Sequence, residues 1–254
     1  TMVDIKAEAL TKAIATMARN MDRQVNRTVI SSDERDAALA RITTSTEYGA
    51  LGDADLVIEA ATEKEEVKRI VYKTMMPHLK PAAMVASNTS SISITRLGAA
   101  TDRPEKFIGM HFMNPVPVMQ LVEIIRGLAT SDATTARVVE LSKAVGKTPV
   151  EVNDYPGFVA NRILMPMINE AVFCVMEGVG TPEAVDTVMK LGMNHPMGPL
   201  ALADLIGLDT CVAILDVLHT GLGDPKYRAC PLLRKYVAAG WLGRKSGRGF
   251  YTYA

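Results

Sequence analysis

The runs Asp55-Leu56-Val57-Ile58-Glu59-Ala60 and Met84-Val85-Ala86-Ser87 decide the fold class of this chain. Each is a short apolar stretch with polar flanks, which is typical of a strand buried on both faces of a parallel sheet. Residues 63–79, which lie between them, have a helical pattern that Pro81 terminates. A strand, a helix and a strand in this order predict a βαβ unit.

The same alternation continues on the carboxyl side of these two runs. Further strands are predicted over residues 106–112, 121–125 and 149–152, with helices over 93–100 and 134–145. We therefore expect an α/β domain over residues 1–153, built on a doubly wound parallel sheet of the Rossmann type.

The remaining residues, 154–254, have a different character. No strand of any length is indicated before Gly249-Phe250-Tyr251. Helical patterns separated by Gly and Pro cover residues 158–177, 181–191, 199–218 and 232–239. The sequence therefore predicts that an all-helical domain follows the α/β domain.

The first residues look like the middle of a Rossmann unit rather than its start. Met2-Val3-Asp4 has the pattern of a strand end, with Asp4 where such a fold holds the acid that binds the cofactor ribose. Residues 4–27 then show helical spacing, and Ser31-Ser32-Asp33-Glu34 is a helix start. The Gly-x-Gly-x-x-Gly turn expected about 20 residues before the acid is not in the sequence. We expect that a first βα unit of about 25 to 30 residues has been lost upstream of Thr1.

Composition and charge exclude several classes of protein. The 254 residues are 48% hydrophobic and 22% charged, which is typical of a globular core and not of a disordered chain. Lys plus Arg and Asp plus Glu both number 28, so no basic field attracts nucleic acid. No apolar run is long enough for a membrane span. The three cysteines, Cys174, Cys211 and Cys230, lie too far apart to suggest a metal site or a disulfide framework, which favours a cytoplasmic location.

Six motifs occur along the chain in a fixed order. Together they resemble the L-3-hydroxyacyl-CoA dehydrogenases, most closely the bacterial 3-hydroxybutyryl-CoA dehydrogenases. The motifs are Asp55-Leu56-Val57-Ile58-Glu59-Ala60-Ala61-Thr62-Glu63, Ser87-Asn88-Thr89-Ser90-Ser91, Gly109-Met110-His111-Phe112-Met113-Asn114-Pro115, Pro156-Gly157-Phe158-Val159-Ala160-Asn161-Arg162, His195-Pro196-Met197-Gly198-Pro199 and Gly243-Arg244-Lys245-Ser246-Gly247-Arg248-Gly249-Phe250-Tyr251.

The resemblance implies an activity, a cofactor and an assembly. The activity is NAD-dependent oxidation of a short-chain (S)-3-hydroxyacyl-CoA, such as 3-hydroxybutyryl-CoA, to the 3-oxoacyl-CoA, and the reverse reduction. The implied partners are NAD, an acyl-CoA substrate and a second copy of the chain. The helical domain also carries more apolar residues than one small domain can bury, which favours a homodimer through this half.

His111 is the candidate general base, because histidine exchanges a proton near neutral pH. It follows an apolar strand and should therefore project into the crevice where open α/β sheets bind ligands. Glu123 is an acid inside an otherwise apolar strand, where it is costly unless paired. An exposed edge-strand position is the alternative interpretation. The resemblance places the acid partner of the histidine at Glu123.

Ser90 and Asn161 complete the expected catalytic group. Ser90 lies in a polar turn after a buried strand, and we expect it to hydrogen-bond the substrate oxygen. Asn161 matches a family residue that touches the substrate. The alternatives are ordinary turn chemistry for Ser90 and a residue near a helix cap for Asn161.

The cofactor site is expected to combine an acid for the ribose with polar residues around the nicotinamide. An acid at Asp4 accepts the ribose hydroxyls and repels a 2′-phosphate, so NAD is favoured over NADP. The other residues that match family positions are Glu63, Lys68, Asn88, Asn114 and Lys245. From spacing alone, Glu63 and Lys68 also fit an exposed helix face, and Lys245 a solvated tail.

Arginines at every fourth position suggest a contact with the 3′-phosphate of coenzyme A. Arg19, Arg23 and Arg27 share one helix face, and Arg23 and Arg27 are the expected substrate contacts. A solvated helix face explains the same pattern.

Two other functions are compatible with parts of the sequence. A non-catalytic fragment or a crystallin-like structural protein could keep the helical dimer domain without the glycine turn. A related dehydrogenase of a 2-hydroxy or branched acid would use no coenzyme A. The intact set of His111, Ser90, Glu123 and Asn161 argues against the structural protein.

Overall fold

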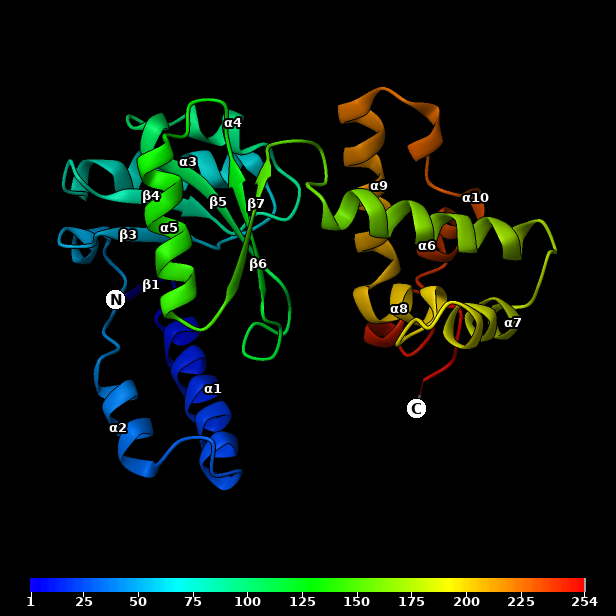
Figure 1. The fold of residues 1–254 in the computed structure, drawn as a ribbon, viewed down its shortest axis with the longest axis horizontal. Helices are drawn as coiled ribbons and strands as arrows, with labels where there is room; N and C mark the ends of the chain where they lie inside the picture. Colours follow the sequence, from blue (N-terminus) through cyan, green and yellow to red (C-terminus); the bar gives the residue numbers. More distant parts are fainter. Residues whose placement is uncertain (254) are drawn as a thin grey trace.

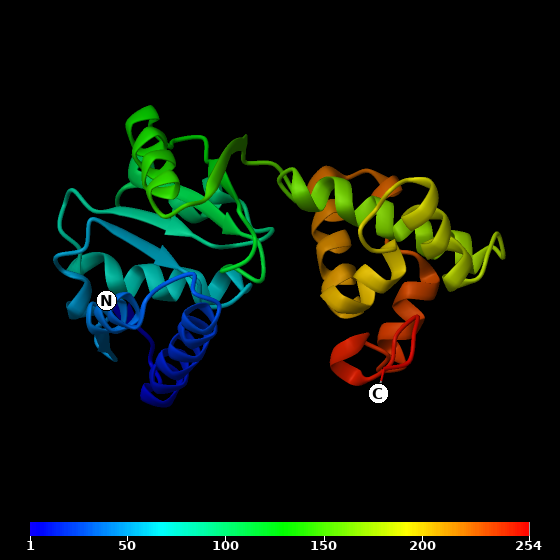
Figure 2. The same cartoon turned by 60° about the horizontal axis from the view of Figure 1, so that its bottom comes forward.

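The computed structural model describes residues 1–253, which form two halves joined through residues 154–159 (Figures 1 and 2). The α/β half runs β1 (Met2–Val3), α1 (Ala7–Asn26), α2 (Ser32–Ala40), β2 (Thr44–Ser45), β3 (Leu56–Glu59), α3 (Glu65–Met75), β4 (Met84–Ser87), α4 (Ile94–Gly98), β5 (Phe107–Phe112), β6 (Leu121–Arg126), α5 (Asp132–Ala144) and β7 (Thr148–Asn153). The helical half consists of α6 (Ala160–Met176), α7 (Pro182–Thr187), α8 (Pro199–Ile206), α9 (Leu208–Leu222) and α10 (Pro231–Ala238).

The main sheet has the strand order β3-β4-β5-β6-β7. Its pairs are parallel, as predicted for a Rossmann-type sheet, except β5 with β6, which is antiparallel. The reason is the connection: residues 113–120 join the two strands without a helix, and the chain turns straight back. A parallel return needs a longer crossover.

Helices cover both faces of this sheet, as a doubly wound fold requires. On one face α3 and α4 enclose a core that includes Tyr72, Leu97 and Phe107. On the other face α5 contributes Val138 to a cluster with Met110 and other strand residues. Residues of β4, β5 and β6 are buried on both faces, and this explains why their sequences are continuously apolar.

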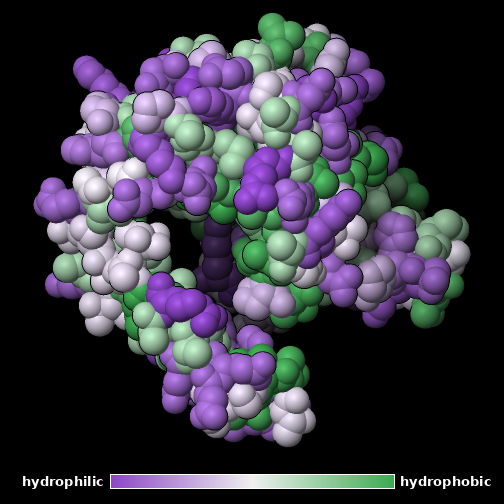
Figure 3. Space-filling model, turned by 60° about the vertical axis from the view of Figure 1, so that its left-hand side comes forward, coloured by the Kyte–Doolittle hydropathy of each residue, from purple (hydrophilic) through white to green (hydrophobic). Residues whose placement is uncertain are grey.

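The first strand pairs outside the main sheet. β1 and β2 form a separate parallel pair, with Met2 opposite Thr44. The strand expected at Met2-Val3 is present, and Ser31 caps α2 through a reciprocal capping box with Glu34. Figure 3 shows an opening in the surface of the molecule. A pocket between α1 and β2 is lined by Ala7, Leu10, Thr11, Ile14, Thr44, Ser45 and Thr46.

The helical half is organised around α9, whose Leu208, Leu215 and Leu218 are fully buried. The prediction of a single helix over residues 199–218 was wrong. This segment is two helices, because Gly207 has φ +104°, a backbone conformation that breaks the helix and favours glycine. The helix expected over residues 181–191 ends at Thr187, and a π turn follows it. No helix within residues 1–253 is long and apolar enough to cross a bilayer.

Two buried aspartates attach the C-terminal segment to this half. The carboxylate of Asp186 accepts hydrogen bonds from the amides of Leu200 and Ala201 and from the hydroxyl of Tyr251. The carboxylate of Asp204 accepts hydrogen bonds from the amides of Phe250 and Tyr251. The last sequence motif thus includes two residues, Phe250 and Tyr251, that hold the C-terminal segment in place.

Candidate active site

His111 and Glu123 form a buried pair on neighbouring strands of the main sheet. They are opposite residues of β5 and β6, and His111 Nδ1 lies 2.8 Å from Glu123 Oε2. His111 is 7% exposed and Glu123 is 2% exposed, so the edge-strand alternative for Glu123 does not hold. The antiparallel register brings the two side chains to the same face of the sheet.

The second oxygen of Glu123 reaches the helical half. Its Oε1 accepts hydrogen bonds from the amides of Val159 and Ala160, at the start of α6. Burial opposes ionisation of this carboxyl, but the hydrogen bonds from His111 and from the amide of Ala160 outweigh it. The pKa of Glu123 therefore lies below its ordinary value. A carboxylate held in this ionised form accepts hydrogen bonds only, so the Nδ1 of His111 carries the proton.

Ser90 lies in a turn that is fixed by Glu63. The Oε1 of Glu63 accepts hydrogen bonds from the amides of Ser90 and Ser91 and from the hydroxyls of Thr89 and Ser91. Asn161 donates from Nδ2 to the carbonyl of Ser90 at 2.9 Å. The turn after β4 is thus joined to the first turn of α6.

The four expected catalytic residues are therefore linked. Ser90 is bonded to Asn161, and Asn161 follows Ala160, whose amide binds Glu123, the partner of His111. The ring of Phe158 lies 5.9 Å from the His111 ring, centroid to centroid. This group combines a proton acceptor, an ionised partner and two hydrogen-bonding side chains at the junction of the two halves.

Lys68 takes a different position from the one expected of a cofactor ligand. Its ammonium is buried and lies 2.7 Å from Glu59 Oε2 and 2.8 Å from Oε1. Tyr72 and Ser87 donate to the same carboxylate. Burial opposes ionisation of Glu59, but its bonds to Lys68 and to the amide of Ala61 hold its pKa below the ordinary value. Lys68 thus holds α3 against the sheet instead of facing the crevice.

Glu59 was missed as a residue of interest, although a signal was present. It is an acid at the end of an apolar strand, the same pattern that marked Glu123. Asn88 also has an internal role, since its Oδ1 accepts the amide of Phe112 and ties the end of β4 to β5.

Five other expected residues lie outside the linked group. Asp4 is exposed after β1 and accepts the amide of Lys6, and Asn114 is exposed on the loop between β5 and β6. Lys245 pairs with Asp209 of α9, so the structure places it within the helical half. Arg23 and Arg27 are exposed at the end of α1.

Comparison with known proteins decides the family. Residues 1–155 match the family model of the 3-hydroxyacyl-CoA dehydrogenase NAD-binding domain, and residues 157–253 match that of the C-terminal domain. The chain belongs to the 3-hydroxyacyl-CoA dehydrogenase family. The match to the NAD-binding model begins at residue 1, and it does not support the expected loss of a βα unit before Thr1.

Individual members of the family are similar over nearly the whole chain. A 3-hydroxybutyryl-CoA dehydrogenase of Bradyrhizobium diazoefficiens is 58% identical over 250 residues, which are 98% of this chain and 85% of that protein. One from Clostridioides difficile is 49% identical over 245 residues, or 96% of this chain and 87% of that protein. The crystal structure of (S)-3-hydroxybutyryl-CoA dehydrogenase from Ralstonia eutropha has a TM-score of 0.97 and 56% identity, covering 100% of this chain and 89% of that one.

Proposed function

We propose that this chain oxidises (S)-3-hydroxybutyryl-CoA to the 3-oxoacyl-CoA with NAD and catalyses the reverse reduction. The observation that carries the proposal is the buried His111–Glu123 pair next to Ser90 and Asn161. The names of the similar dehydrogenases support the substrate.

His111 acts as the general base in this reaction. Its Nδ1 donates to Glu123, so the lone pair for the substrate hydroxyl proton is on Nε2. Glu123 stabilises the imidazolium that forms and keeps the ring in one orientation. Ser90 and Asn161 hold the substrate oxygen while the proton leaves.

The residues present fit NAD at two places. Asp4 has an exposed carboxylate directly after β1, where a dinucleotide fold holds the ribose acid. Glu63 fixes the Ser90 turn, which lies where we propose that the nicotinamide binds, and Asn88 ties the end of β4 to β5. When bound, NAD supplies the acceptor for the hydride from C3. Asn114 and Lys245 remain proposed contacts, and Lys68 contributes by positioning α3.

The two halves divide the work. Residues 1–153 bind the cofactor, and residues 154–254 bind substrate and form a homodimer. Arg23 and Arg27 are available for the 3′-phosphate of coenzyme A. The three free cysteines fit the reducing conditions of the cytoplasm, where we propose that the protein works.

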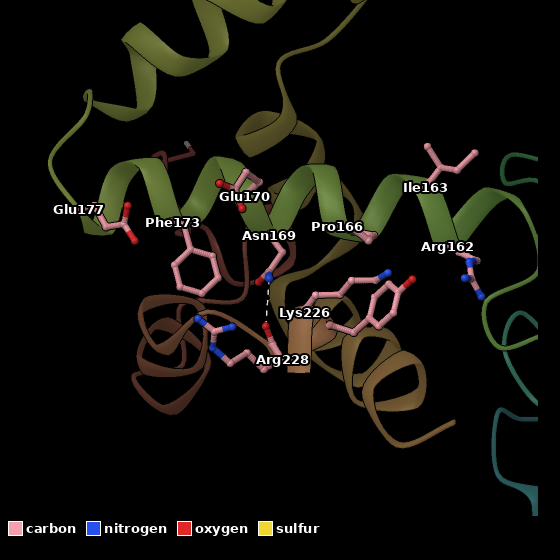
Figure 4. Close-up of a pocket in the computed structure, with 10 residues that line it drawn as sticks. Arg162, Ile163, Pro166, Asn169, Glu170, Phe173, Glu177, Lys226 and Arg228 are labelled. Carbon is pink, nitrogen blue, oxygen red and sulfur yellow. Dashed lines mark hydrogen bonds between the residues drawn. The ribbon is translucent and has the colours of Figure 1, made fainter. Parts of the chain in front are cut away.

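The dimer would form along α6. Ile163 is 68% exposed, and in Figure 4 its side chain points away from Lys226 and Arg228. The pocket beside this helix is lined by Ile163 itself, by several charged residues and by Phe173, over whose ring the Arg228 guanidinium lies. A large exposed apolar residue on a long helix suits an isologous contact between two copies.

A substrate comparison tests this function. NADH formation should be measured with (S)-3-hydroxybutyryl-CoA, with its (R) enantiomer and with free 3-hydroxybutyrate. The proposal predicts turnover of the (S)-thioester and at least about tenfold lower kcat/KM for the other two. Equal use of the free acid would favour a dehydrogenase that does not need coenzyme A. If none of the three compounds gave NADH, a structural role would be favoured.

A further inference from the structure

Asp154 makes a set of long-range contacts that the catalytic group does not explain. It is the first residue after β7 and begins the linker to the helical half. Its carboxylate accepts hydrogen bonds from the Ser93 hydroxyl at 2.7 Å, the Ile94 amide at 3.1 Å and the Thr95 amide at 2.8 Å. These donors form the start of α4, whose N-cap is Ser93, so the linker supplies further acceptors to the start of a helix that lies about sixty residues earlier in sequence.

The helix start that Asp154 holds is also the end of the Ser90 turn. This turn is anchored on one side by Glu63, which binds the amides of Ser90 and Ser91. On the second side Asn161 binds the carbonyl of Ser90. Asp154 is the third anchor. Two of the three anchors thus come from the segment 154–161, which consists of the linker and the start of α6.

We propose that Asp154 is a positioning residue for Ser90. Asp154 fixes the start of α4 against the linker. It thereby holds the Ser90 turn in the position where the carbonyl of Ser90 accepts the hydrogen bond from Asn161. The position of Ser90 then depends on the same contacts that hold the helical half against the α/β half. The claim rests on the proposed function for the role of Ser90 in catalysis, whereas the geometry it describes is independent of substrate.

Asp186 provides a matched control within the same chain. It also accepts two backbone amides, from Leu200 and Ala201, and one hydroxyl, from Tyr251. It therefore holds the start of α8 as Asp154 holds the start of α4, but in the helical half. Asp154→Asn, Asp154→Ala and Asp186→Asn should be compared with the natural chain. The Asn variants keep the size of the side chain and one acceptor oxygen, so they are the milder probes.

The first readout is kinetic. Asp154→Ala should lower kcat by about 10- to 100-fold because Ser90 is misplaced. Asp154→Asn should retain more activity than Asp154→Ala. The midpoints of the pH–rate profile should stay unchanged, since the His111–Glu123 pair is intact. Asp186→Asn should keep kcat within about threefold of the natural chain even if its melting temperature falls.

The second readout is amide hydrogen exchange by NMR, which needs neither substrate nor cofactor. Faster exchange at Ile94 and Thr95 follows trivially from losing Asp154. The proposal requires that exchange also speeds at Ser90 and Ser91, whose amides bind Glu63 and not Asp154. The proposal would be overturned if exchange became faster only at residues 94 and 95, or if Asp154→Ala had the kcat of the natural chain. If the natural chain does not oxidise 3-hydroxybutyryl-CoA, the proposed function fails, and exchange at Ser90 still decides the positioning claim.

Discussion

His111 and Glu123 face each other across the antiparallel strands β5 and β6, and the same carboxylate that holds the imidazole also caps α6. Glu123 therefore connects the candidate base to the junction between the two halves. A change at this residue should affect activity and stability together.

Glu123→Gln tests that connection and its pH dependence. The pKa of Glu123 in the folded state lies below its ordinary value of 4.5, so the native chain binds fewer protons than the unfolded chain between the two values. Its stabilising effect is present above about pH 4.5 and is lost as pH falls through the lowered pKa. The difference in free energy of unfolding between the natural chain and Glu123→Gln should be about 1.5–3 kcal/mol near neutral pH and should shrink on acidification. Urea unfolding at several pH values checks this, and a constant difference would contradict it.

Lys68→Met should destabilise the α/β half strongly. It leaves Glu59 buried without its cation, and breaking one partner of such a pair costs about 3–5 kcal/mol. The double change Glu59→Leu with Lys68→Met should recover part of that loss. Lys80→Met breaks an exposed pair with Asp55 and should cost less than about 1 kcal/mol. Urea unfolding followed by circular dichroism measures all three. Equal losses for Lys68→Met and Lys80→Met would contradict the structural role given to Lys68.

Ile163→Asp should convert a dimer to a monomer. Light scattering should give twice 27.4 kDa for the natural chain and 27.4 kDa for the variant. Ile70→Asp is the matched control, because Ile70 is 65% exposed on α3, in the other half. It should leave the dimer intact. A monomeric natural chain, or dissociation by Ile70→Asp alone, would place the interface elsewhere or remove it.

Asp4→Asn should weaken the preference for NAD over NADP. The amide keeps the size of the side chain but removes the charge that accepts ribose hydroxyls and repels a 2′-phosphate. We expect KM for NAD to rise by about tenfold, with a smaller change for NADP. Asp33→Asn, at an exposed position on α2, is the control. Unchanged KM values for both cofactors would show that Asp4 does not contact the ribose.

The sequence predicted the positions of the strands well, but it did not predict that β5 and β6 are antiparallel. An apolar run has the same composition in parallel and antiparallel neighbours, so β6 could not be oriented from its residues alone. The direction follows from the short connection over residues 113–120. The cost of an acid in an apolar strand indicated that Glu123 is paired, and the family resemblance implied that its partner is His111; the two side chains lie within hydrogen-bonding distance.

The remaining site residues depended on contacts that spacing does not reveal. Lys68 is one of several charged residues on a helix, and only the fold shows that it faces the buried Glu59. The partners of Asp154 lie about sixty residues away in the chain, so no local pattern marks it. Gly207 ends α8 through its positive φ, whereas the apolar spacing on both sides reads as one helix.

The central claim is that His111 takes the proton of the substrate hydroxyl. The most direct test is steady-state oxidation of (S)-3-hydroxybutyryl-CoA with NAD by the natural chain and by His111→Ala, with KM determined for both. The account predicts that kcat falls by about two to four powers of ten while KM changes little, because the lost group acts in the transition state. Retention of more than half of the natural kcat by the variant would contradict it.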